Sequence, residues 1–143
     1  MLMNDFRLFA FKFLSAMSGL DIEAFLDRDA AVFDHFYGAL AEQYALGELK
    51  ASGDIPVYYW AREGSSKAEV DFIIQTGNRV IPIEVKAERN LKAKSLKSFI
   101  NIHSPAVAVR SSLSDFGQSD YAGCAIYDIP LYMIGNLASM ING

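Results

Sequence analysis

This sequence of 143 residues is poor in cysteine and histidine and has no long apolar run. Its single cysteine, Cys124, excludes an internal disulfide and a cysteine-cluster zinc site, and it fits a reducing compartment. Only His35 and His103 offer imidazole, so a bound metal must be held by carboxylates, which favour a hard cation such as Mg²⁺ or Mn²⁺. No apolar run approaches the roughly 20 residues that cross a bilayer. We therefore expect a cytoplasmic protein with no membrane segment.

Hydrophobic residues make up 52% of the chain and charged residues 21%, which excludes a disordered or fibrous protein. The net charge of −4 argues against strong, nonspecific binding of nucleic acid by the whole surface. Charge is nevertheless uneven: residues 1–54 carry nine acids and four bases, whereas residues 55–110 carry five acids and nine bases. Five bases fall within the segment Lys86–Lys97, which is a candidate contact for DNA. The alternative is that these bases only solvate a surface helix.

The spacing of apolar residues predicts the element order α-β-β-β-α-β, which is an α/β (α+β) fold with a mixed sheet flanked by helices. The first helix is predicted from about residue 30 to 51, with apolar residues on two sides, one of which includes Ala39 and Leu49. The elements that follow are three strands, a helix that begins after Asn90 and a fourth strand, at residues 57–60, 68–75, 80–87, 91–101 and 106–110. Because a helix connects the third and fourth strands, we expect those strands to be parallel.

The length of the chain predicts one domain, 1–143, which we divide into three parts. Residues 1–30 form an N-terminal extension, residues 31–110 form the core, and residues 111–143 form a C-terminal strand and helix. In the last part we expect the strand at 123–129 and the helix at 131–140, after Pro130.

Two carboxylates and a lysine are expected to converge on neighbouring strands. Asp71 lies on the second predicted strand, and Glu84 and Lys86 lie two residues apart on the third, so these two point to the same side. Carboxylates can hold a divalent ion that polarises a scissile phosphate and lowers the pKa of the attacking water. The lysine can orient that water or neutralise the developing charge. Glu42 or Glu48, from the preceding helix, can complete the metal shell. The alternative is that these are ordinary polar residues on a half-exposed sheet.

These residues resemble the PD-(D/E)XK nuclease superfamily, which includes restriction endonucleases and Holliday-junction resolvases. The chain is also similar to the domain of unknown function at the C-terminus of many bacterial and archaeal AAA+ ATPases. Four motifs carry this similarity: Gly38-x-x-x-Glu42 followed by Glu48-Leu49, Tyr59-Trp60, Glu69-Val70-Asp71-Phe72 and Ile81-Pro82-Ile83-Glu84-Val85-Lys86. The Asp-x-Gly-Leu-Leu strand that usually precedes the long helix in that family is not found here.

The resemblance implies a restriction-endonuclease-like core in which Asp71, Glu84 and Lys86 are catalytic. It also implies that Mg²⁺ or Mn²⁺ is held by Asp71, Glu84 and Glu42, and it favours Glu42 over Glu48. The neighbouring aromatic residues, Tyr58, Tyr59 and Trp60, can stack on bases, although aromatic residues on strands usually pack in cores.

Two functions of different classes fit this resemblance. The first is a metal-dependent endodeoxyribonuclease. The second is a non-catalytic domain that binds nucleic acid or protein and that is joined to, or docks on, an AAA+ ATPase. A third is an oligomerisation domain of the ATPase, and the sequence leaves open whether the chain forms homo-oligomers. No G-x-x-x-x-G-K-[ST] motif occurs, so we expect no ATPase activity in this chain, which then resembles an excised or stand-alone C-terminal domain.

Overall fold

A mixed sheet with the strand order β1-β2-β3-β4-β6-β5 forms the centre of the molecule. Its strands are Val57–Ala61 (β1), Glu69–Thr76 (β2), Arg79–Val85 (β3), Val107–Ser112 (β4), Gly117–Tyr121 (β5) and Cys124–Pro130 (β6). β1, β2 and β3 are antiparallel neighbours, β4 is parallel to both β3 and β6, and β5 is antiparallel to β6. The prediction of a mixed sheet is therefore confirmed, as is the parallel pairing of β3 with β4.

The computed structural model describes residues 30–53, 55–64, 68–87 and 93–142, and it describes side chains from residue 37 onward. The predictions for the extension at residues 1–29 and for Asn90 as a helix cap lie outside this part of the chain. Within it, no helix is both long enough and apolar enough to span a membrane.

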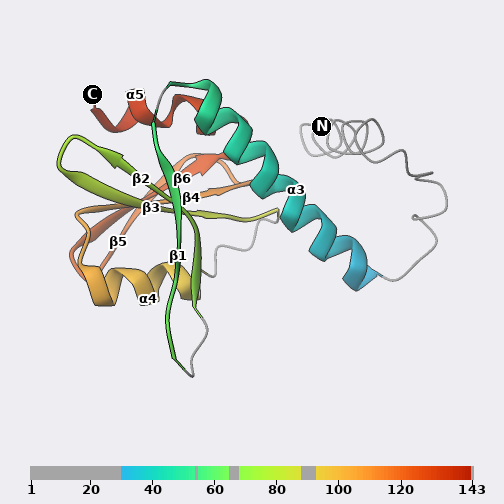
Figure 1. Cartoon of the computed structure of the whole chain (residues 1–143), viewed down its shortest axis with the longest axis horizontal. Coiled ribbons are helices and arrows are strands. Elements are labelled where there is room, and N and C mark those ends of the chain that lie inside the picture. The colour runs from blue at the N-terminus through green and yellow to red at the C-terminus, as the bar shows by residue number, and fades with distance from the viewer. Residues whose placement is uncertain (1–29, 54, 65–67, 88–92, 143) are drawn as a thin grey trace.

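Helices cover both sides of the sheet (Figure 1). On one side lie α3 (Ala30–Ala51), the 3₁₀ helix η1 (Leu131–Asn136) and α5 (Leu137–Asn142), and on the other lies α4 (Lys94–His103). The α3 side holds the larger apolar cluster, which includes Ala45, Leu49, Ile81, Ile83, Ile134 and Leu137. The α4 side holds a smaller cluster, with Leu96, Ile100, Ala108, Cys124 and Ile126. The central strands β3, β4 and β6 are mostly buried, because the two clusters cover both faces of the sheet there, and this explains why these strands are so apolar.

Small residues let α3 approach the sheet closely. Ala41, Ala45 and Leu49 recur every four residues and are buried, so they form one stripe on the helix surface. Ala39 is exposed, so the prediction that it belongs to a second buried seam is wrong. An apolar residue in the middle of a helix need not be buried, because the positions of the neighbouring elements decide which side of the helix packs against the core.

The C-terminal third differs most from the prediction. The sequence predicts one strand there, whereas the structure has two, and β5 is the strand that was missed. The predicted helix at 131–140 is split into η1 and α5. α4 begins at Lys94, later than predicted, and it includes His103, which was expected in a loop. Polar residues fill β5, so its strand character comes from pairing with β6 at the sheet edge rather than from an apolar pattern.

Candidate functional site

Asp71 and Glu84 meet where the ladder between β2 and β3 ends. Paired residues run from Thr76–Arg79 to Phe72–Ile83, so Asp71 and Glu84 are the next residues on the two strands. The Asp71 Oδ2 atom accepts a hydrogen bond of 2.7 Å from the backbone N–H of Val85. The Asp71 carboxylate thus takes the place of a backbone acceptor and is fixed against β3.

The pairing of β2 with β1 has a bulge at Asp71, the same residue at which the ladder between β2 and β3 ends. The register between β1 and β2 shifts by one residue between two partner pairs, Tyr58–Ile73 and Trp60–Val70. One residue of β1, Tyr59, consequently faces two residues of β2, Asp71 and Phe72. Bulges at sheet edges change the direction of a side chain. The shift interrupts the pairing with β1, although buried and less buried residues still alternate along β2.

Glu84 and Lys86 form an ion pair at the end of β3. The Lys86 Nζ atom lies 2.7 Å from the Glu84 Oε1 atom. The backbone N–H of Lys86 donates a hydrogen bond of 2.8 Å to the carbonyl oxygen of Ser111, which ties this end of β3 to β4. Glu84 is only 3% exposed, and its second oxygen, Oε2, is buried with no hydrogen-bond partner in the described part of the chain. A buried carboxylate oxygen without a partner is costly and needs a proton, a water molecule or a cation.

The charges of this cluster act on one another. Burial raises the pKa of Glu84, and the negative charges of Asp71 and Glu42 raise it further, against a hydrogen bond from Lys86. Burial likewise raises the pKa of Asp71, although the hydrogen bond from Val85 opposes this. For Lys86, burial lowers the pKa, but the hydrogen bond and charge of Glu84 and the charges of the other two acids outweigh it, so the pKa is raised. Lys86 therefore remains an ammonium group at neutral pH.

Glu42 belongs to the same cluster and Glu48 does not. Burial raises the pKa of Glu42, and Asp71 is the next largest cause, with Lys86 opposing it. Glu48 lies beside η1, where its Oε2 atom is 2.9 Å from the position that a Cβ on Gly135 would occupy. The two residues are six positions apart, so they lie on different sides of α3. The helix side chain that approaches the acids of β2 and β3 is accordingly Glu42.

The chemistry of the cluster suits a hard cation, but its present arrangement is not a complete metal shell. Carboxylate oxygens are the ligands that Mg²⁺ and Mn²⁺ prefer. The Glu84 Oε2 atom accepts no hydrogen bond in the described part of the chain, so it is a candidate ligand. In the described residues, however, no three His, Cys, Asp or Glu side chains are close enough together to hold one metal ion. The chemical nature of these side chains therefore fits a cation, but three of them do not lie close enough together to bind one ion.

The aromatic run of β1 divides into two parts. Trp60 packs edge-on against Phe99 and His103 of α4, with ring centroids 5.2 and 5.7 Å away. Tyr58 and Tyr59 are exposed. The interpretation as core residues thus holds for Trp60 but not for the two tyrosines.

The basic segment is described only in part. Lys94 and Lys97 are exposed on α4, and the Lys97 Nζ atom lies 4.9 Å from the ring centroid of Tyr121. Residues 88–92, which carry two more of its bases, lie outside the described part of the chain. Cys124 is buried, as is common for a cysteine outside a disulfide.

A buried ion pair was not foreseen from the sequence. Arg110 of β4 and Asp128 of β6 are partners in the sheet, and the guanidinium donates two hydrogen bonds, of 2.6 and 2.9 Å, to the carboxylate. Arg110 is also the sheet partner of Glu84. The available signal was one acid within the apolar run 124–130 and one base at the end of another apolar strand, since buried charges are usually paired.

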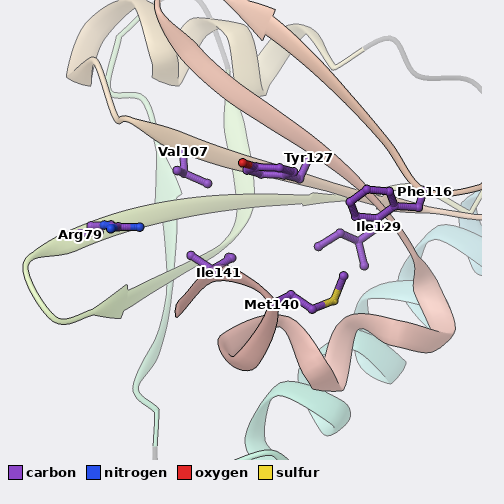
Figure 2. A pocket seen from close by; sticks show the side chains of 7 residues that line it. All are labelled: Arg79, Val107, Phe116, Tyr127, Ile129, Met140 and Ile141. Carbon is purple, nitrogen blue, oxygen red and sulfur yellow. The ribbon is translucent and has the colours of Figure 1, made fainter. Parts of the chain in front are cut away.

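A separate cavity of about 210 Å³, with both polar and apolar groups in its lining, lies between the sheet and α5 (Figure 2). Its lining is Arg79, Val107, Phe116, Tyr127, Ile129, Met140 and Ile141. Arg79 begins β3 and Glu84 lies near its end, so the two are about 16 Å apart along the strand. The cavity contains no carboxylate in its lining and is distinct from the acidic cluster.

Comparisons with known proteins give one family and a weak structural similarity. The family described as "Domain of unknown function (DUF4143)" matches residues 37–132, a range that includes the whole acidic cluster. One solved structure contains a chain that is 14% identical to this one, with a TM-score of 0.46. That structure is described as a half-complex of Thermococcus gammatolerans McrB AAA+ hexamers with bound McrC. That similarity covers 77% of this chain and 33% of the other, so this chain spans about a third of the other's length. No curated protein matches.

Proposed function

Because the chain belongs to the DUF4143 family of domains of unknown function, which is associated with AAA-type ATPases, we propose that it is an accessory domain of an AAA+ ATPase that hydrolyses phosphodiester bonds. We propose a PD-(D/E)XK-like site in which Asp71, Glu84 and Lys86 are catalytic. The observation that carries the proposal is the buried Glu84 carboxylate, which is paired with Lys86 through one oxygen, lies beside Asp71 and has no partner for its other oxygen.

In this proposal the acids hold a cation and the lysine holds the substrate. Asp71 and Glu84, with Glu42, would bind Mg²⁺ or Mn²⁺, which when bound polarises a phosphate and lowers the pKa of water. Burial raises the pKa of both Asp71 and Glu84 because it disfavours their charged forms. A cation beside them would stabilise those charged forms. The Val85 N–H fixes the orientation of Asp71 before substrate arrives.

Lys86 has a different part in the reaction. Its raised pKa keeps the side chain protonated at neutral pH, so it cannot remove a proton from the attacking water. As an ammonium group it can donate hydrogen bonds to a phosphoryl oxygen and neutralise the charge that develops there. Its pairing with Glu84 keeps the ammonium group at the end of β3, where the substrate would lie.

A non-catalytic accessory domain is the second candidate. It is favoured by the lack of any three potential ligands close enough to share a metal ion in the described residues. In that case the domain binds DNA or protein for its ATPase, and the cluster is only a polar patch beside the β2 bulge. DNA would then contact the exposed bases of α4, Lys94 and Lys97.

A nuclease assay separates these candidates. We would incubate the purified chain with Mg²⁺ or Mn²⁺ and single-stranded, duplex and branched DNA, and compare it with Asp71→Asn and Lys86→Met. The expected result is metal-dependent cleavage that both variants reduce by at least 100-fold, since general acid–base and electrostatic groups each contribute about that much. Glu63→Gln, a change at an exposed residue outside the cluster, is the matched control and should retain cleavage.

Cleavage that persists unchanged in Asp71→Asn would show a contaminating nuclease and contradict the proposed site. If no substrate is cleaved with either metal, the accessory function replaces the catalytic one.

A further inference from the structure

The exposed tyrosines of β1 lie on the free edge of the sheet. β1 is the first strand in the sheet order, so within the described residues β2 is its one neighbouring strand. Tyr58 is 59% exposed and Tyr59 is 80% exposed, whereas the next residue, Trp60, packs against α4. Successive residues of a strand point to opposite faces of the sheet, so Tyr59 lies on the face opposite to Trp60, with its ring exposed to a ligand.

The bulge places Tyr59 next to the acidic cluster. Tyr59 faces Asp71 and Phe72 across the shifted register. Neighbouring strands are about 4.8 Å apart, so the backbone of Tyr59 is about 5 Å from that of Asp71 and about 10 Å from that of Glu84. One nucleotide of an extended strand covers a comparable length. A base that stacks on Tyr59 therefore places its own or a neighbouring phosphate at the cluster.

Positive charge lies on the same path. Arg62 follows β1 and is exposed, about 10 Å along the chain from Tyr59, and its backbone N–H is hydrogen-bonded to Ala68. The Lys86 ammonium group lies on the other side of Asp71, at the end of β3. The two cations flank Tyr59 and the acids, as is expected where a polyanion crosses the sheet edge.

On the basis of the proposed phosphodiester site, we propose that Tyr59 is a stacking platform for unpaired bases, which makes single-stranded nucleic acid the substrate class. Stacking on a protein ring needs a free base face, and the bases of a duplex are already stacked on one another. The platform would hold the bases without reading their sequence, because every base has an aromatic face. Arg62 and Lys86 would contact the phosphates.

Binding can be measured without hydrolysis. We would follow the fluorescence anisotropy of a labelled 20-nucleotide oligothymidylate and of a 20-base-pair duplex, at low salt and without divalent metal. The expected result is tighter binding of the single strand, and a loss of about 5-fold to 100-fold in its affinity with Tyr59→Ala. Tyr58→Ala, a change on the other face of the sheet, should retain the affinity. Tyr59→Phe should retain the affinity, because the ring remains.

Tyr132→Ala is the matched control, because Tyr132 is a similarly exposed tyrosine, at 61%, but lies on η1, away from β1. It should leave oligothymidylate binding unchanged. Circular dichroism and the fluorescence of Trp60, the chain's one tryptophan, would verify that each variant is folded. Equal affinity for duplex and single strand, or unchanged binding in Tyr59→Ala, overturns the proposal.

Sedimentation of the same proteins tests the other occupant of a free sheet edge, a strand from a second copy. If Tyr59→Ala dissociates a dimer and does not weaken oligothymidylate binding, the edge is an interface between copies and the platform is wrong. The proposed function fails separately: tyrosine-dependent binding without any metal-dependent cleavage supports the platform and refutes catalysis. Cleavage of duplex DNA that is unaffected by Tyr59→Ala supports catalysis and refutes the platform.

Discussion

At the scale of single residues, burial sets the behaviour of the acids. Asp71 and Glu84 have raised pKa values because burial disfavours their charged forms. The folded state therefore holds a proton on these groups more tightly than the unfolded state does. The stability that this contributes is present below the ordinary pKa values, near 4, and is lost as pH rises through the raised values.

Glu84→Gln should change how stability depends on pH. Glutamine cannot ionise, so the variant lacks the loss that wild type suffers as Glu84 becomes charged. Relative to wild type, the unfolding free energy of Glu84→Gln should be higher at pH 7 than at pH 4.5. Urea unfolding across this range measures the difference, with exposed Glu63→Gln as the control. A difference that stays constant or falls with pH would mean that Glu84 is stabilised as a carboxylate.

The pair formed by Arg110 and Asp128 should be costly to break and cheap to replace. Both side chains are about 10% exposed, so Asp128→Ala removes the carboxylate that accepts two hydrogen bonds from a buried guanidinium. We expect a loss of about 3–5 kcal/mol in unfolding free energy. The double variant Arg110→Met, Asp128→Leu removes both charges and should recover most of that loss. Denaturant unfolding checks both, and a loss under about 1 kcal/mol for Asp128→Ala would contradict the expectation.

At the scale of elements, tight turns determine how the strands pair. β2 and β3 are joined by the two residues Gly77 and Asn78, and Gly77 has a φ of 60°. A positive φ at the first position of a two-residue hairpin is typical of a type II′ turn, which requires glycine there. At the other edge of the sheet, β5 and β6 are joined by the two residues Ala122 and Gly123, and both of these residues have a positive φ.

Two glycine substitutions should therefore have opposite effects. Gly77→Ala puts a Cβ on a positive-φ residue and should lower the unfolding free energy by about 1–2 kcal/mol. Gly47→Ala lies on an exposed position of α3 with nothing within 4 Å of the new Cβ, and it should raise stability by about 0.5–1 kcal/mol. Thermal melts of both variants test this. Equal effects of the same sign would mean that the turn does not constrain the hairpin.

At the scale of the whole molecule, metal binding should couple to stability. If Asp71, Glu84 and Glu42 hold a cation only in the folded state, a hundredfold excess over Kd stabilises the protein by about 2.7 kcal/mol. For a chain of this size the melting temperature should rise by about 5–10 °C. Asp71→Asn keeps an oxygen that can accept from Val85 and removes a repelling charge, so without metal it should be at least as stable as wild type.

Melts of wild type and Asp71→Asn, with and without millimolar Mg²⁺ or Mn²⁺, measure this coupling, and the variant should lose most of the metal-dependent rise. A destabilised Asp71→Asn together with a wild type that does not respond to metal would indicate that Asp71 only holds β3 in place.

The sequence by itself determined the order of the elements from α3 to β4. Apolar alternation and the turn at Thr76–Asn78 predict the β2–β3 hairpin, because a strand has a period of two and the turn residues permit only a few conformations. The connection through α4 predicts parallel pairing of β3 and β4, because a parallel neighbour needs a crossover. These features depend on local spacing, which a sequence records directly.

Only the tertiary structure decided the features that depend on contacts between distant residues. β5 is strand because β6 offers it a partner, and its joining turn places Ala122 at a positive φ that no turn motif announces. The bulge that sets Tyr59 opposite Asp71 is a mismatch between two strands, so neither strand records it alone. Likewise, the exposure of Tyr59, the pairing of Arg110 with Asp128 and the approach of Glu42 rather than Glu48 follow from what packs beside each residue. Burial and proximity are properties of the assembled layers, and the order of residues fixes them only through folding.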